Sequence, residues 1–266
     1  MLNKTVAAVK SVKLTRTIVS SALAFGTIIT FGNVPAQAFQ IFFGEDLNNS
    51  NSVPLASFPN ASDAESNFLS NLVEVGTEDF EGFATGASGL LDLTFPDSDI
   101  TATLSGGGGR IRSVPVGSTN GVGRYGTSGT NFWELSTGGS NNFQVDFDTA
   151  VGAFGFYGID IGDFAGQLAV ELSNGTIETF TVPNTVGSFG STDGSVLFFG
   201  IVAEDHSEKF MSVDFLTTTG QGDVFAFDDF TVGDIEKTPE PASVLGLLAL
   251  SALGTTFLKR KHKEKV

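Results

Sequence analysis

The chain has 266 residues, no cysteine and a formal net charge of −16. The lack of cysteine excludes disulfides, thiol chemistry and Cys-ligated metals, and the acidic balance disfavours binding to phosphate backbones. With only two histidines, one of them in a basic C-terminal end, a zinc site built from several histidines is also excluded.

Residues 1–38 have the composition of a secretory signal peptide. Basic side chains come first, an apolar stretch follows at residues 18–31, and Ala36 and Ala38 occupy the −3 and −1 positions of a cleavage site. Export signals have this order of basic, apolar and small residues. The apolar stretch is shorter than the ~20 residues of a membrane span. We therefore expect signal peptidase to cleave before Phe39. The alternative is that the segment is retained as an N-terminal membrane helix.

Residues 39–237 form the predicted mature domain, which is long enough for one substantial core. This region holds 28 acidic and five basic residues, so its formal charge is −23. The charge disfavours nucleic acid and anionic lipid and favours divalent cations or neutral sugars, although an acidic surface also serves solubility alone. Its one histidine, His206, lies among acidic residues and is interpreted as a loop residue, so a Ser-His-Asp triad is not expected.

The first expected element is a helix near residues 62–73, after a polar stretch at residues 48–60. Ser62 is expected to cap this helix, with Glu65 completing a capping box. Apolar side chains recur at helical spacing and predict one buried face. These residues are Ala61, Ala64, Phe68, Leu69 and Leu72.

Short runs of alternating apolar and polar residues, separated by Gly, Asn and Asp, predict antiparallel strands. The clearest runs lie at residues 90–95, 142–147, 167–172 and 210–215. Continuous apolar runs at residues 151–159 and 196–202 predict buried strands, and an Asn-Gly pair at 174–175 predicts a hairpin with a type I′ turn. These elements indicate a mostly β fold: an antiparallel β-sandwich of jelly-roll type with one short helix near its N-terminus.

Residues 105–133 form a segment rich in Gly, Ser and Thr that carries three of the five basic residues and the only Trp of the chain. Aromatic faces stack on sugar CH groups, and Arg hydrogen-bonds hydroxyls or carboxylates, so one hypothesis is a glycan-binding loop. The alternative is that Trp133, which follows Phe132, begins a strand and packs in the core. The residues of the glycan hypothesis are Arg110, Arg112, Arg124, Tyr125 and Trp133.

Residues 238–266 combine a Pro-Glu-Pro motif, an uncharged apolar stretch at residues 242–258 and a basic end at residues 259–265. A helix over the apolar stretch would rise ~25 Å, at the short limit for crossing a bilayer. The basic end would stay cytoplasmic. We therefore expect a single C-terminal transmembrane helix with the main domain outside. A plain anchor and a processed sorting signal are the two alternatives.

Pro239, Glu240 and Pro241, with the apolar span and basic end, resemble a PEP-CTERM sorting domain, although Thr238 stands where the family commonly has Val. The resemblance implies recognition by an exosortase-like transpeptidase in an exopolysaccharide-producing Gram-negative bacterium. It also implies that inner-membrane anchoring is transient and is followed by transfer to the cell surface or extracellular matrix. The resemblance covers only the tail and does not concern the activity of the domain.

Segments at residues 79–83 and 225–230 are similar to core strands of the domains that precede such tails, and of galactose-binding-like sandwiches and carbohydrate-binding modules. In several of those sandwiches a calcium ion joins the first and last strands. The matching positions here are Glu81, Asp228 and Asp229, so the resemblance implies a candidate structural Ca²⁺ site. The alternative is that these carboxylates cap backbone N–H groups in turns.

Three functions follow from these features. We favour an exported structural or adhesive protein of the cell surface or matrix, without enzymatic activity, that contacts extracellular polysaccharide. A dedicated carbohydrate-binding module is the alternative and depends on the Arg-rich loop. A secreted glycoside hydrolase would need two placed carboxylates, and an abundance of acidic residues is no evidence for such a pair.

Overall fold

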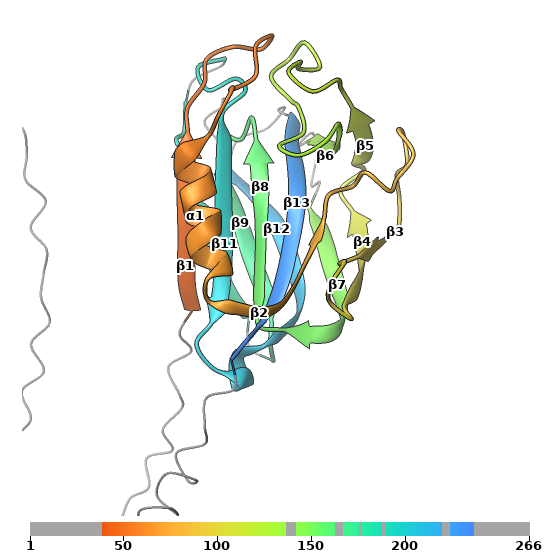
Figure 1. Cartoon of the computed structure of the whole chain (residues 1–266), viewed down its shortest axis with the longest axis vertical. Coiled ribbons are helices and arrows are strands. Elements are labelled where there is room, and N and C mark those ends of the chain that lie inside the picture. Colours follow the sequence, from red (N-terminus) through yellow and green to blue (C-terminus); the bar gives the residue numbers. More distant parts are fainter. Residues whose placement is uncertain are drawn as a thin grey trace, which may run out of the picture. The chain divides into compact units, whose positions relative to one another are not determined.

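The structure is a computed structural model. It shows thirteen strands in two antiparallel sheets, and one α-helix, within the part of the chain that it describes (Figure 1). The predicted mostly β fold with two antiparallel sheets and a helix is therefore confirmed. For residues 167–170 and 217–219 only the backbone is described. The described residues are 39–136, 142–162, 167–175, 177–187, 190–219 and 224–236.

The first sheet has seven strands: β1 (Phe39–Asp46), β2 (Leu72–Glu78), β5 (Arg110–Ser113), β6 (Asn131–Ser136), β8 (Ala153–Ile159), β11 (Val196–Ala203) and β13 (Val224–Ile235). Their order is β1-β11-β8-β13-β6-β5, and β2 pairs with the second half of β13. Every residue of β8 and β11 is buried, because one face packs on the other sheet and the opposite face packs on the helix. The two continuous apolar runs are therefore buried strands, as predicted.

The second sheet has six strands: β3 (Leu91–Thr94), β4 (Thr101–Gly106), β7 (Phe143–Val151), β9 (Gln167–Ser173), β10 (Ile177–Thr181) and β12 (Phe210–Thr219). Their order is β10-β9-β12-β7-β4-β3. In β7, Phe143, Val145 and Phe147 are buried, whereas Gln144 and Asp146 between them are not. This period of two shows that only one face of the sheet is covered, as the alternating runs predicted.

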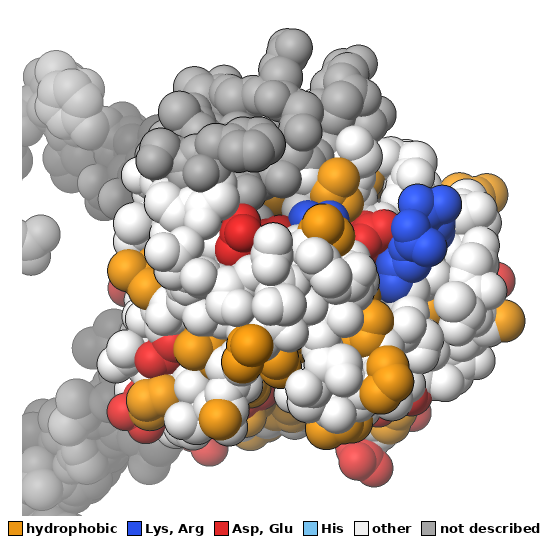
Figure 2. Space-filling model, turned by 90° about the horizontal axis from the view of Figure 1, so that it is seen from above, with side chains coloured by type: hydrophobic (Ala, Val, Ile, Leu, Met, Phe, Trp, Pro, Cys, Tyr) orange, Lys and Arg blue, Asp and Glu red, His pale blue; other side chains and the backbone are white. Residues whose placement is uncertain are grey.

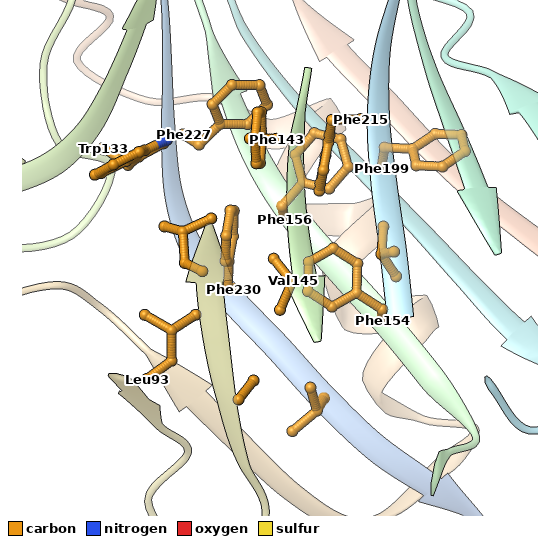
Figure 3. Close-up of a cluster of buried hydrophobic side chains, with 14 of the residues drawn as sticks. Leu93, Trp133, Phe143, Val145, Phe154, Phe156, Phe199, Phe215, Phe227 and Phe230 are labelled. Carbon is orange, nitrogen blue, oxygen red and sulfur yellow. The ribbon is translucent and has the colours of Figure 1, made fainter. Parts of the chain in front are cut away.

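Phenylalanine rings from both sheets fill the space between them (Figure 3). The ring of Phe156 in β8 lies 5.2 Å from that of Phe215 and 5.5 Å from that of Phe227, measured between centroids. Most of these pairs are tilted or edge-to-face, the arrangements that aromatic quadrupoles favour. Burial of each such ring contributes about 1.5–3 kcal/mol. The ring cluster is therefore a main source of stability in this cysteine-free domain.

The helix α1 (Pro59–Leu69) begins earlier than predicted. Phe58 is the N-cap residue and its own side chain makes no capping hydrogen bond, so the predicted capping box of Ser62 and Glu65 is wrong. Asp46 Oδ2 in β1 caps the first turn instead, by accepting a hydrogen bond from Ala61 N at 2.9 Å. Proline fits the first turn because its missing N–H would have no partner within the helix. Leu72, predicted as helical, belongs to β2. The predicted buried face is confirmed for Ala61, Ala64 and Phe68.

A pair of glycines lets α1 approach the first sheet closely. Gly155 in β8 is paired with Gly200 in β11. A Cβ atom would lie 3.1 Å from the Phe68 ring if added to Gly155, and 2.6 Å from it if added to Gly200. Phe68 therefore packs directly on the backbone of the sheet, where a larger residue would displace the helix.

The strand β13 changes its partners at a bulge formed by Asp228 and Asp229. Before the bulge it pairs with β6 up to Phe227, and after it with β2 from Phe230. Asp229 has a φ angle of +48°, and the register against β8 shifts at this point. The extra residue of a bulge re-aims neighbouring side chains, and here it brings two carboxylates to the same loop.

The predicted hairpin at residues 172–177 exists, but its turn differs from the prediction. Ser173 lies opposite Ile177, so three residues connect β9 to β10. A type I′ turn has two connecting residues, both with positive φ. Gly175, with a φ angle of +93°, provides the left-handed conformation in this longer loop.

The described domain begins and ends at the same end of the sandwich. Phe39 pairs with Ala203, and Gln40, Ala203 and Glu236 line one shallow pocket. At the opposite end, three segments are joined by backbone hydrogen bonds, such as Ser50 N to Asp193 O and Gly123 N to Asn51 O. We call this the loop end. Its segments are residues 47–58, 114–126 and 190–195.

The targeting predictions fall outside the described residues. This applies to the signal peptide (1–38), the Pro-Glu-Pro motif and the expected transmembrane helix (242–258). No helix in the described part of the chain combines the length and the apolar character needed to span a bilayer.

Candidate functional site

Three arginine side chains converge on Glu134, whose own side chain is only 7% exposed. Arg112 Nε donates to Glu134 Oε1 at 2.7 Å, and Arg110 Nε lies 3.8 Å from the same oxygen. Arg124 Nε and Asn120 Nδ2 donate to Oε2 at 3.4 and 3.0 Å. A buried carboxylate is costly unless it is paired and hydrogen-bonded. Glu134 is therefore the centre around which this region is built.

Arg124 links the loop end to the first sheet. Its Nη1 donates to Asp160 Oδ2 at 2.8 Å and to the Val224 carbonyl at 2.9 Å. Asp160, which has a φ angle of +64°, also accepts a hydrogen bond from Gly194 N at 3.0 Å. Because Arg124 is only 8% exposed and its Nε and Nη1 groups donate to Glu134, Asp160 and the Val224 carbonyl, its role is structural.

The two aromatic residues of the hypothetical glycan-binding loop are buried. Tyr125 accepts a hydrogen bond from Leu55 N at 3.1 Å and donates to Gly194 O at 2.9 Å, and burial raises its pKa to about 12. Trp133 is fully buried between the sheets, as the alternative interpretation predicted. Neither ring offers a face to a sugar in this arrangement.

Arg110 and Arg112 alone among the five residues of that hypothesis have exposed side chains, at 53% and 42%. Figure 2 views the loop end and shows a large group of basic atoms and a smaller one nearer the centre, with acidic groups between and beside them and a mostly uncharged surface around them. The structure thus divides the predicted site into three buried residues that build the loop and two exposed residues that remain available for contact.

Asp228 and Asp229 hold residues 127–128 against β13. Asp228 Oδ2 accepts hydrogen bonds from Thr127 N at 2.7 Å and Ser128 N at 3.1 Å. Asp229 Oδ1 and Oδ2 accept from the hydroxyls of Ser128 at 2.6 Å and Thr127 at 3.0 Å. Burial raises the pKa of both carboxyl groups, that of Asp228 well above its usual range, and the adjacent Asp229 charge raises the pKa of Asp228 further.

Glu81 binds the continuation of the same loop, because its Oε1 accepts hydrogen bonds from Thr130 N at 2.6 Å and Asn131 N at 2.5 Å. The structure therefore brings together the three residues of the calcium hypothesis, Glu81, Asp228 and Asp229. Their oxygens face N–H and O–H donors, which satisfy the carboxylates and occupy the positions that a cation would need.

Calcium requires six to eight oxygen ligands. Within the described residues, no group of three acidic or histidine side chains is arranged to hold a metal ion. The three carboxylates therefore do not fit a calcium ion, and they act as caps for the backbone of residues 127–131. His206 is exposed in a short 3₁₀ helix (His206–Glu208), in agreement with its interpretation as a loop residue.

Sequence reasoning missed Glu134 and Asn120, which organise the arginine cluster. A signal was present, because Glu134 is the single acid in an apolar run of four residues, Phe132 to Leu135. A strand of that composition is buried, and a buried acid needs a cation. With so few cations in the domain, the arginines nearby in the sequence were the natural partners.

No protein-family model and no curated protein matches this chain. Solved structures that resemble it include the K2 cleaved adhesin domain of Lys-gingipain, with 16% identity and a TM-score of 0.38 over 59% of this chain and 97% of that one. The CBM22-1 xylan-binding domain from Paenibacillus barcinonensis Xyn10C has 13% identity and a TM-score of 0.35, over 62% and 99% of the two chains. TmCBM61, solved in complex with β-1,4-galactotriose, has 15% identity and a TM-score of 0.29, over 50% and 88%. These neighbours are binding modules and adhesin domains, and similarity at this level implies no ligand for this chain.

Proposed function

We propose that this chain is an exported, non-catalytic protein of the cell surface or matrix, held at one end of its sandwich and exposing the loop end to extracellular polysaccharide. The observation that carries the proposal is the position of Phe39 and Glu236 at the same end of the domain. A tail that follows Glu236 would therefore hold the domain by the end opposite the loops.

The ends of the sequence support export. A basic, apolar and small-residue series precedes Phe39, and Pro239, Glu240 and Pro241 are followed by an apolar stretch and a basic end. On this proposal, signal peptidase removes residues 1–38 and an exosortase-like transpeptidase acts at the tail. Inner-membrane anchoring is then a transient stage before the protein reaches the surface or matrix.

A binding role is favoured over catalysis by the state of the acidic groups. Burial raises the pKa of both Asp228 and Asp229, that of Asp228 well above its usual range, and an acid catalyst needs a raised pKa. They are almost fully buried, however, and their oxygens are engaged by the loop at residues 127–128. A substrate would have to displace that loop to reach them. The alternative function, a dedicated carbohydrate-binding module, is favoured by the two exposed arginines Arg110 and Arg112.

The absence of cysteine allows a direct test. Val116, which is 79% exposed in the loop end, is replaced with cysteine, and intact host cells are treated with a membrane-impermeant maleimide. We expect V116C to be labelled on intact cells. Adding Glu240→Ala should abolish that labelling, because the protein would remain in the inner membrane. If V116C is labelled only after cell lysis, the chain is not displayed and the proposal is wrong.

A further inference from the structure

The exposed arginines have hydrogen-bond donors that the protein does not use. Arg110 and Arg112 are two residues apart on β5, so they share one face and lie about 7 Å apart along the strand. Ile111 between them is buried in the core. Glu134 is approached only through their Nε atoms, and within the described residues their terminal Nη groups make no hydrogen bond to protein.

The cluster also carries an excess of positive charge. Three guanidinium groups, those of Arg110, Arg112 and Arg124, face two buried carboxylates, those of Glu134 and Asp160. Arg124 is matched by Asp160 and shares Glu134 with the other two. The unmatched charge therefore lies on the exposed pair, in a domain whose formal charge is otherwise strongly negative.

The strand β5, which carries Arg110 and Arg112, is held by backbone hydrogen bonds on both sides. On one side β5 pairs with β6, where Arg110 lies opposite Glu134. On the other side Ile111 exchanges backbone hydrogen bonds with Gly86 and Ala87, at 2.8 Å each. The Nε contacts with Glu134 restrict the arginine side chains further. A site that is ordered before binding loses less conformational entropy when a ligand arrives.

We infer that Arg110 and Arg112 form a binding site for the carboxylate groups of an acidic polysaccharide; this inference rests on the proposed function and names its ligand class. A guanidinium group matches a carboxylate with two parallel hydrogen bonds, and the terminal Nη groups are the donors that remain. Two such groups about 7 Å apart are suited to carboxylates carried on a chain of sugars.

The negative charge of the rest of the domain disfavours polyanions whose charges are more closely spaced than those of an acidic polysaccharide. Duplex DNA carries a negative charge about every 1.7 Å, so most of its phosphates would face an acidic surface. A glycan with carboxylates on some of its sugars places fewer charges there. At physiological ionic strength repulsion from exposed charges fades beyond about 8 Å, whereas hydrogen bonds at the two arginines persist. The ligand is thereby confined to the two arginines on β5, beside the loop end.

The test measures binding of the purified full-length chain, in mild detergent, to immobilised polygalacturonate, with neutral dextran and duplex DNA as comparison polymers. We expect binding to polygalacturonate alone. The R110Q/R112Q double variant should lose at least about tenfold in affinity, because hydrogen bonds to charged groups are the stronger class. Lys209→Gln removes a positive charge from the contact with Asp234, away from β5, and should change affinity less than about twofold.

Folding of each variant is checked by its melting temperature. If R112Q unfolds, the R110Q single variant is used instead. It should stay folded, because the Arg110 side chain only approaches Glu134, at 3.8 Å. The inference is overturned if folded R110Q and the double variant bind polygalacturonate as tightly as the wild type, or if DNA binds equally well. If the V116C form is labelled on intact cells but the purified chain does not bind polygalacturonate, the binding site is refuted and the proposed function stands. Binding without surface labelling supports the site and refutes the proposed display.

Discussion

Replacing Arg124 with methionine should strongly destabilise the domain. Methionine retains much of the apolar stem, while the hydrogen bonds to Asp160, to the Val224 carbonyl and to Glu134 are lost. Glu134 keeps Arg112 and Asn120, whereas Asp160, only 1% exposed, keeps the hydrogen bond from Gly194 N but loses its ion pair with Arg124. Breaking a buried ion pair in this way costs about 3–5 kcal/mol. For a domain of this size the melting temperature should fall by about 6–20 °C.

Urea unfolding followed by tryptophan fluorescence measures this loss directly, because the single Trp of the chain, Trp133, is fully buried. Arg110→Met is the matched control: it removes the same charge from the same cluster, but from a side chain that is 53% exposed, 3.8 Å from its partner. Exposed pairs contribute about 0–1 kcal/mol. If R124M lost no more unfolding free energy than R110M, the ion-pair network would not be what joins the loop end to the sheet.

Raised pKa values at Asp228 and Asp229 mean that the folded state holds protons that the unfolded state releases. Their contribution to stability is present below about pH 4 and is lost as pH rises through the folded pKa, so melting temperatures should be higher at pH 5 than at pH 8, and Asp229→Asn should reduce that difference. Because the carboxylates of Asp228 and Glu81 accept hydrogen bonds from the loop at residues 127–131, melting curves in calcium and in chelator should coincide. A higher melting temperature in calcium would show a calcium site, which contradicts this geometry. Phe156→Ala should cost about 3–5 kcal/mol in unfolding free energy, whereas Gly200→Ala should weaken the docking of α1 and be detected as faster hydrogen exchange in that helix.

Local patterns of apolar and polar residues along the sequence predicted most of the strands. The apolar runs of β8 and β11 and the alternation in β7 needed no tertiary information. The helix boundary was harder, since Ser62 and Glu65 fit a capping box, while the helix in fact starts at Pro59 and its first turn is capped by Asp46 from β1. Local preference was overridden there by the packing of Phe68 on the sheet.

The candidate site depended on contacts between distant residues, which local patterns do not reveal. Glu81 and Asp228 were predicted to lie near each other, and they do contact the same loop, but the donors at residues 127–131 that satisfy them were not foreseen. The three arginines of the glycan hypothesis do lie together, around Glu134. Which of them would be buried depended on Asp160 after β8, which is 36 residues from Arg124 in sequence.

The route of β13 through the first sheet has a mechanical consequence. This strand ends beside the point where the chain leaves the domain, and it is bonded to β8 on one side and to β6 and then β2 on the other. A pulling force between a tail after Glu236 and a ligand held at the loop end would act along the strand axis. Under the proposed attachment, the hydrogen bonds of β13 would be loaded together in shear rather than opened one after another.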